Sequence, residues 1–111
     1  RHPAKARLSH PGEGVGGVHI GVCTIDLQLP GNQSLKGKRS VVKSITTRVS
    51  REFNVSIAEV EAQDVWQQAV LGVSCVSSSA DYAHGQLERV VEWIESHRPD
   101  VVLLDYRIEM L

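Results

Sequence analysis

The sequence predicts an α+β domain with the element order βαββαβ, in which two helices cover one face of a four-stranded antiparallel sheet. In four segments, apolar residues alternate with polar ones or form short runs rich in β-branched residues, and we interpret these segments as strands. In two longer segments, apolar residues recur at spacings of three and four, as on the buried side of a helix. The 111 residues, 41% of them hydrophobic, are enough for one domain with an ordinary core.

The first strand and the first helix are predicted from their different periodicities. Residues 18–29 alternate between apolar and polar side chains until Pro30 ends the strand. Residues 38–53 predict a helix that begins near Ser34 or Gly37. Its apolar stripe is formed by Val42, Ile45, Val49 and Phe53.

The second half of the chain predicts two further strands, a helix and a last strand. Residues 54–60 and 69–76 are rich in apolar and β-branched residues and are joined by a turn around residues 61–64. A Ser-Ser-Ala-Asp sequence resembling a capping box opens a helix over residues 80–97, which a proline then stops. The last strand, residues 101–110, is expected to place four residues on one side: Val102, Leu104, Tyr106 and Ile108.

This element order is the split βαβ arrangement of ferredoxin-like domains, in which right-handed crossovers place the first and third strands in the centre of the sheet. The domain is expected to span residues 18–111. Its predicted core consists of Cys23, Ile25, Leu27, Val42, Ile45, Val49, Leu71, Val73, Leu87, Val90, Ile94, Leu104 and Ile108.

The first seventeen residues predict a disordered tail. Residues 1–17 show no periodicity and contain two prolines and five glycines or serines. Folded sequence begins abruptly at Val18. One hypothesis is therefore that Val18 is the true translation start and that the tail lies upstream of it.

Basic residues are concentrated in the first predicted helix. Six of the twelve lysines and arginines lie between Lys36 and Arg51 without an acid among them, although the formal net charge of the chain is −1. A surface of this kind can dock a polyanion, and the absence of Glu at i,i+4 favours docking over a merely solvated face. The second helix carries acids on its outer side instead. The residues predicted to bind an anion such as an RNA phosphate are Lys36, Lys38, Arg39, Lys43 and Arg51.

Nothing in the sequence indicates an enzyme. Residues 31–39 resemble a nucleotide-binding P-loop, but five residues instead of four separate the glycines, and no Ser or Thr follows Lys38. The histidines have no carboxylate or cysteine at motif spacing, so no metal or cofactor is expected. Cys23 and Cys75 lie in apolar runs and predict buried free thiols.

The uncovered side of the sheet is the second candidate surface. Alternation places no aromatic residue on its central strands, so the base stacking of RRM domains is not expected there. Trp66, near the turn, is interpreted as a hydrophobic cover for the end of the sheet in preference to the alternative, a binding platform. A patch for a dimer or a docked partner segment is expected from Val22, Val70, Val76 and Leu103. An ordinary half-polar sheet surface explains the same residues equally well.

Three stretches resemble the YlxP-like family of small bacterial proteins: GVCTIDLQLPGNQSLKGKRSVVKSI (residues 21–45), FNVSIAEVEAQDVWQQAVLGVS (residues 53–74) and the terminal LLDYRIEML. The resemblance covers residues 18–111 and implies a ferredoxin-like fold. Family members begin almost at the position of Val18. Their genes commonly neighbour genes for translation initiation and ribosome maturation, which implies a role linked to the ribosome. The family implies no catalytic residues.

These observations favour a non-enzymatic accessory protein that contacts ribosomal RNA or a ribosomal particle through its basic helix. The alternative is a homodimeric interaction module that uses the open sheet face and binds no nucleic acid. No apolar run is long enough to span a bilayer and no signal peptide is recognisable, so we expect a cytoplasmic protein.

Overall fold

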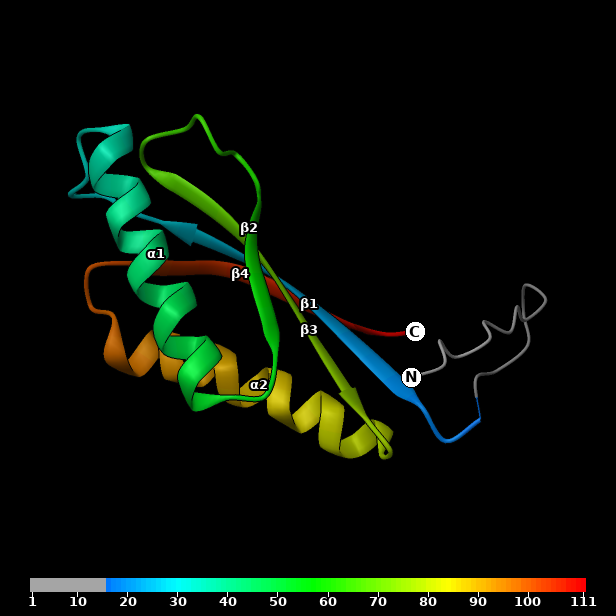
Figure 1. The fold of residues 1–111 in the computed structure, drawn as a ribbon. Coiled ribbons are helices and arrows are strands. Elements are labelled where there is room, and N and C mark those ends of the chain that lie inside the picture. The colour runs from blue at the N-terminus through cyan, green and yellow to red at the C-terminus, as the bar shows by residue number, and fades with distance from the viewer. Residues whose placement is uncertain (1–15) are drawn as a thin grey trace, which may run out of the picture.

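The computed structural model describes residues 16–111. Its element order is β1 (His19–Gln28), α1 (Leu35–Glu52), β2 (Ser56–Glu61), β3 (Gln68–Ser77), α2 (Ala80–His97) and β4 (Val102–Met110). Both helices lie on one side of the sheet (Figure 1). The strand order is β2-β3-β1-β4 and every pairing is antiparallel, which confirms the ferredoxin-like arrangement with β1 and β3 in the centre.

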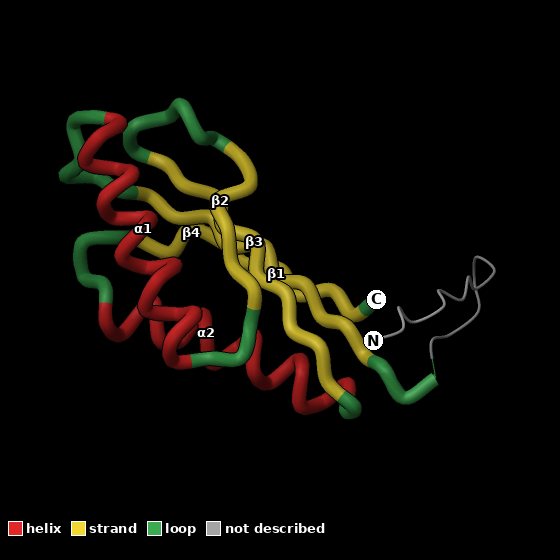
Figure 2. The backbone as a smooth tube through the Cα atoms, in the orientation of Figure 1, coloured by secondary structure: helices red, strands yellow, loops and turns green. Residues whose placement is uncertain are grey.

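The two helices pack on different parts of the sheet. α2 contacts β1, β3 and β4, whereas α1 contacts β2 at one edge (Figure 2). Both helices begin at a serine N-cap, because a hydroxyl oxygen can accept a hydrogen bond from an otherwise unpaired N–H of the first turn. The Oγ of Ser34 accepts from the N–H of Gly37 at 2.9 Å, and the Oγ of Ser79 accepts from the N–H of Tyr82 at 3.2 Å.

Most of the predicted core is confirmed, including Cys23, Ile45 and Leu87, which are buried between the sheet and the helices. Ile108 is only partly buried and packs against the edge of this core. Leu104 is wrong as a core residue, because 52% of it is exposed.

A β-bulge in β4 explains the error. Asp26 of β1 lies opposite Asp105, but the next residue, Leu27, lies opposite Leu103, so Leu104 is an extra residue without a partner. The bulge reverses the alternation of the strand before it. Leu103 therefore packs against the core and not on the open face, contrary to the prediction for that residue.

The two cysteines are free and buried, as predicted. Burial raises the pKa of the Cys23 thiol to about 11. It also raises the pKa of the Cys75 thiol, against the opposing effect of the positive charge of Arg89. Both thiols therefore stay protonated at neutral pH, and protonated thiols are poor nucleophiles and poor metal ligands.

The predicted tail, residues 1–17, lies outside the described residues except for Gly16 and Gly17. The disorder of this segment and the start at Val18 stay predictions. Among residues 16–111, no helix is long and apolar enough to cross a membrane.

Candidate nucleic-acid interface

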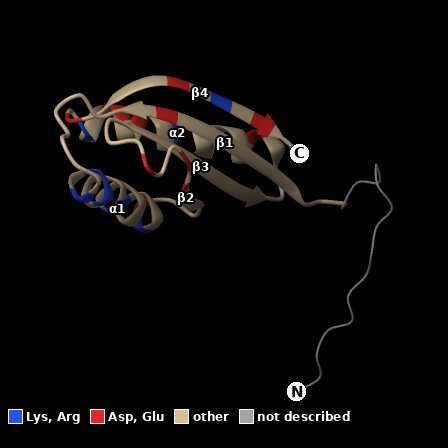
Figure 3. Cartoon of the chain, turned by 90° about the horizontal axis from the view of Figure 1, so that it is seen from above, with Lys and Arg blue, Asp and Glu red and all other residues tan. Residues whose placement is uncertain are grey.

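Four exposed cations of α1 lie on one side of the helix and are called the basic face: Lys36, Arg39, Lys43 and Arg51. They lie opposite the buried stripe of the helix and extend over roughly 22 Å at 1.5 Å per residue. Figure 3 shows the basic residues along α1. Among the described residues, none of the four has an acidic partner within ion-pair distance.

Two further cations of this layer are engaged elsewhere. The guanidinium of Arg48 lies 5.6 Å from the ring centroid of Trp93 and 4.0 Å from Glu52. Arg98 donates to the Oγ of Ser44 at 2.9 Å and is paired with an aspartate. Both arginines therefore connect the helices and are less available for an external anion than the basic face.

Lys38 does not belong to the basic face, contrary to the prediction. Its exposed fraction is 0%, and its Nζ lies 2.8 Å from Oε2 of Glu59. The ammonium also donates a hydrogen bond to the carbonyl oxygen of Ala62. The spacing of Lys38 to the buried Val42 and Ile45 is four and seven residues, so the periodicity already placed this lysine on the apolar stripe.

The partners of Lys38 come from the end of β2. Glu59 lies opposite Leu71, whereas Glu61 lies opposite Val70, so Val60 forms a bulge between them. Ala62 follows with φ 59°, a left-handed conformation that turns the chain. Its carbonyl oxygen accepts from the N–H of Val65 as well as from Lys38. A buried lysine thus joins the start of the β2–β3 connection to the first turn of α1.

A second connection runs through Asn32, in the loop between β1 and α1. Its Nδ2 donates to the carbonyl oxygen of Trp66 at 2.6 Å and to that of Ser34 at 2.7 Å. The side chain of Gln67 donates back to the carbonyl oxygen of Asn32 at 3.1 Å. The Asn32 amide occupies the space where residue 37 would carry a Cβ, so Gly37 is required for this close approach.

These contacts hold the hairpin tip, residues 62–67, against the start of the basic helix. The interpretation of Trp66 as a cover for the sheet is wrong, because 53% of this residue is exposed. Val65 beside it is exposed as well. The sequence identified the segment around residues 31–39 as a motif, but gave no sign that it binds the main chain of a tryptophan more than thirty residues away.

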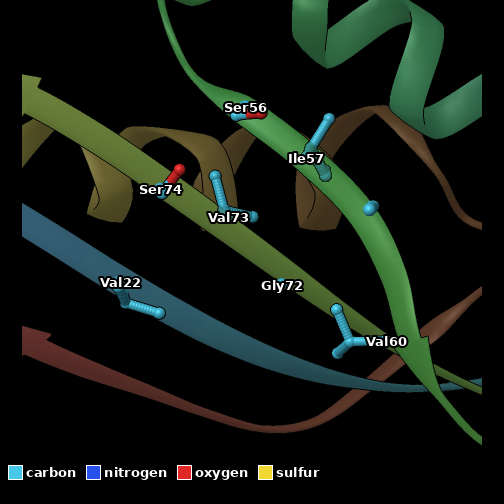
Figure 4. A pocket seen from close by; sticks show the side chains of 8 residues that line it. Val22, Ser56, Ile57, Val60, Gly72, Val73 and Ser74 are labelled. Atoms are coloured by element: carbon cyan, nitrogen blue, oxygen red, sulfur yellow. The ribbon is translucent and has the colours of Figure 1, made fainter.

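The open sheet face does not form the predicted continuous apolar patch. Val76 is 60% exposed, but Val70 is buried, Val22 is half-buried and Leu103 faces the core. A shallow hollow of about 230 Å³ lies between β1, β2 and β3, with Val60 leaning over Gly72 (Figure 4).

The other end of the open face is acidic. A hollow of about 220 Å³ is lined by Asp26, Glu61 and Asp105 together with Arg107 and neutral residues. Gln68 donates to Oδ1 of Asp26 at 3.0 Å. The outer side of α2 is acidic too, as predicted, with Asp81, Glu88, Glu92 and Glu95. A polyanion is therefore attracted to α1 and repelled by these two surfaces.

The family described as "Protein of unknown function (DUF503)" matches residues 20–108 of the chain. The chain belongs to this family. The Uncharacterized protein YlxP of Bacillus subtilis (strain 168) is 49% identical to it over 63 residues, which are 57% of this chain and 68% of YlxP. The predicted resemblance to the YlxP-like family is thereby confirmed. The designed protein Ferredog-Diesel aligns with a TM-score of 0.44 and 14% identity, over 98% of this chain and 96% of its own.

Proposed function

We propose that this DUF503 protein is a non-enzymatic accessory protein that binds the phosphates of ribosomal RNA, free or in a ribosomal particle, through its basic face. One observation carries the proposal: Lys36, Arg39, Lys43 and Arg51 are exposed along one side of α1 and have no acidic partner within residues 16–111. Helix surfaces that serve solubility usually mix both signs of charge to gain pairing energy.

Binding through phosphates has a characteristic salt dependence. Each lysine or arginine that neutralises a phosphate releases condensed counterions, so the logarithm of affinity falls linearly with the logarithm of salt concentration. Four contacts predict a loss of roughly a hundredfold between about 50 and 200 mM salt. Sequence preference should be weak, because phosphates carry no base information.

Replacing Arg39 and Lys43 together by glutamine should flatten this slope by nearly two units and weaken RNA binding at low salt, because two of four phosphate contacts are lost. The measurement is a titration of labelled ribosomal RNA fragments at several salt concentrations, together with co-sedimentation with ribosomal particles. Both side chains are exposed, so the fold should be unchanged.

The matched control replaces Glu88 and Glu92 of α2 by glutamine, which should not weaken binding. If the Arg39→Gln, Lys43→Gln variant binds RNA and particles as tightly as the parent at every salt concentration, the basic face is only a solvated surface and the proposal is wrong.

A second candidate function, a homodimeric interaction module, is favoured by the free edge of β4 more than by the open sheet face. Within the part of the chain that the structure describes, β4 pairs with β1 and with no other strand. The N–H of Leu111 donates to the carbonyl oxygen of Ile20, so Leu111 is a position of β4 whose main chain bonds to β1. Along an antiparallel ladder, every second residue bonds to the partner strand in this way. The N–H and C=O groups of the residues in between, such as Tyr106 and Ile108, therefore point away from β1 toward the free edge. Tyr106 and Met110 are also exposed along this edge. A free edge of this kind is a template for another strand.

The charges on β4 select a register for pairing with a second copy. An antiparallel pair centred on Ile108 places Arg107 opposite Glu109 of the second copy, twice, and Tyr106 opposite its Met110. A pair centred on Arg107 would place two arginines opposite each other and Asp105 opposite Glu109. The Ile108 register also avoids the bulge at Leu104, which interrupts regular pairing.

Charge reversal at Arg107 tests this dimer. Arg107→Glu should raise the dissociation constant at least tenfold (~1.4 kcal/mol), because two attractive cross-strand pairs become repulsive. Adding Glu109→Arg should restore dimerisation, because each copy again places an acid opposite a base of the other copy. The double change also keeps an acid and a base at positions 107 and 109 of the same strand, whose side chains are 3.1 Å apart in the parent. Sedimentation velocity at several concentrations measures the effect. A parent protein that is strictly monomeric at high micromolar concentration would exclude the dimer.

A further inference from the structure

We propose that Trp66 is a stacking platform for an unpaired base of a single-stranded RNA whose phosphates lie on the basic face. This inference rests on the proposed RNA-binding function and names the form of RNA that the site takes. It assigns base stacking to the hairpin tip, away from the open sheet face where RRM domains stack bases.

The position of Trp66 is defined by its main chain. Its carbonyl oxygen accepts from Nδ2 of Asn32 at 2.6 Å, and the same amide lies directly over Gly37 in the first turn of α1. Lys36 belongs to this same turn, Arg39 follows directly after it, and both are exposed. The tip therefore brings the main chain of Trp66 to the N-terminal turn of α1, where the basic face begins, although the two segments are far apart in the sequence.

The platform is exposed on a tip that is firmly held. The N–H of Leu29 donates to the carbonyl oxygen of Gln67 at 2.8 Å, and Lys38 binds the carbonyl oxygen of Ala62 at the other end of the tip. Anchors on both sides of Trp66 reduce the entropy that the tip would lose on binding. Trp66, about half of which is exposed on this anchored tip, can therefore stack on a base with little rearrangement of the tip.

The second tryptophan provides an internal contrast. Trp93 is buried, stacks on His97 with ring centroids 4.8 Å apart and lies beneath Arg48. All of its contacts are therefore within the protein. The ring of Trp66 has no stacking or cation–π partner among the described residues, and 53% of this residue is exposed to solvent.

The charge on the α1 side of the tip favours a nucleic acid over a protein segment as the partner, whereas Glu61 on the other side lines the acidic hollow. The first turn of α1 contains no acid, and its N-terminal end carries the positive end of the helix dipole. Asp64 lies exposed on the tip itself, so a phosphate chain should approach from the side of α1. Single-strand binding sites commonly combine such a positive track with aromatic rings, and each stacked base contributes roughly five- to a hundredfold in affinity.

The test compares a single-stranded oligo(U) of about twelve nucleotides with heparin, a polyanion that has no bases. Oligo(U) should quench tryptophan emission in the parent but not in Trp66→Phe, which retains only the buried Trp93. Heparin should bind without quenching. Trp66→Ala should lower the affinity for oligo(U) at least fivefold and leave the affinity for heparin unchanged, whereas Trp66→Phe should retain most of the affinity for oligo(U).

The outcomes separate this inference from the proposed function. If Trp66→Ala binds oligo(U) like the parent and no quenching occurs, while Arg39→Gln, Lys43→Gln loses affinity for both polyanions, the stacking platform is wrong and phosphate binding stands. If Trp66→Ala weakens heparin as much as oligo(U), Trp66 only supports the tip and the inference is overturned. If the charge variant weakens neither polyanion, both proposals fail.

Discussion

Replacing Lys38 with methionine is expected to lower the free energy of unfolding by about 3–5 kcal/mol. The ammonium of Lys38 is fully buried and is the partner of Glu59, whose side chain is only 17% exposed. Oε2 of Glu59 is buried, and apart from the ion pair with Lys38 it has no hydrogen-bond partner among the described residues. Methionine would fill the space of the lysine stem but would leave this carboxylate and the Ala62 carbonyl without the ammonium. Urea denaturation followed by circular dichroism measures the loss.

Two comparison variants make this result specific. Lys36→Met removes an exposed charge two residues away, and it should change stability by no more than about 0.5 kcal/mol. Combining Lys38→Met with Glu59→Leu should recover much of the loss, because no uncompensated charge remains buried. A Lys38→Met variant as stable as the parent would show that the ion pair contributes nothing, and the hairpin tip would then need another anchor.

Ile45→Asp is expected to unfold the domain. Ile45 is 1% exposed in the centre of the helix stripe that faces the sheet, where no described cation is placed to pair with a new carboxylate. An unpaired buried charge costs several kcal/mol in addition to the lost apolar contacts, which is comparable to the whole stability of a domain of this size. Loss of far-ultraviolet circular dichroism and of dispersed amide resonances would record the unfolding.

Thr47→Asp is the matched control for this variant, because it introduces the same acid two residues away on the exposed side of α1. This variant should stay folded. It should also weaken RNA binding, since the new acid lies among the cations of the basic face. A folded Ile45→Asp variant would mean that the helix is rotated from the orientation described above.

The sequence predicted the elements and their order because each strand and helix repeats its own period over many residues. A bulge has no such signal: nothing in the residues themselves distinguishes Leu103 from Leu104, and the exchange of their environments depends on pairing with β1. Tertiary pairing of this kind is not encoded in the local pattern.

The candidate site was predicted only in part, because some of its residues depend on contacts between elements that the local sequence pattern does not show. The periodicity placed Lys36, Arg39, Lys43 and Arg51 on the outer side of α1, which the structure confirms as their position. Lys38 shares the period of the buried stripe, but a lysine is normally exposed, and only the carboxylate of Glu59 from another element makes its burial tolerable. The position of the Trp66 main chain likewise depends on a contact with a distant asparagine, Asn32.

The spacing between the two anchors of the hairpin tip limits how this segment can diverge among related proteins. The carbonyl oxygens of Ala62 and Trp66 are both bound, one by Lys38 and the other by Asn32. Between them, Gln63, Asp64 and Val65 are exposed. Substitutions at these three positions leave both anchors in place, whereas an inserted or deleted residue would pull one carbonyl away from its donor. Evolution can therefore change these three side chains without disturbing the anchors, whereas a change in the length of the segment between them would break one of them.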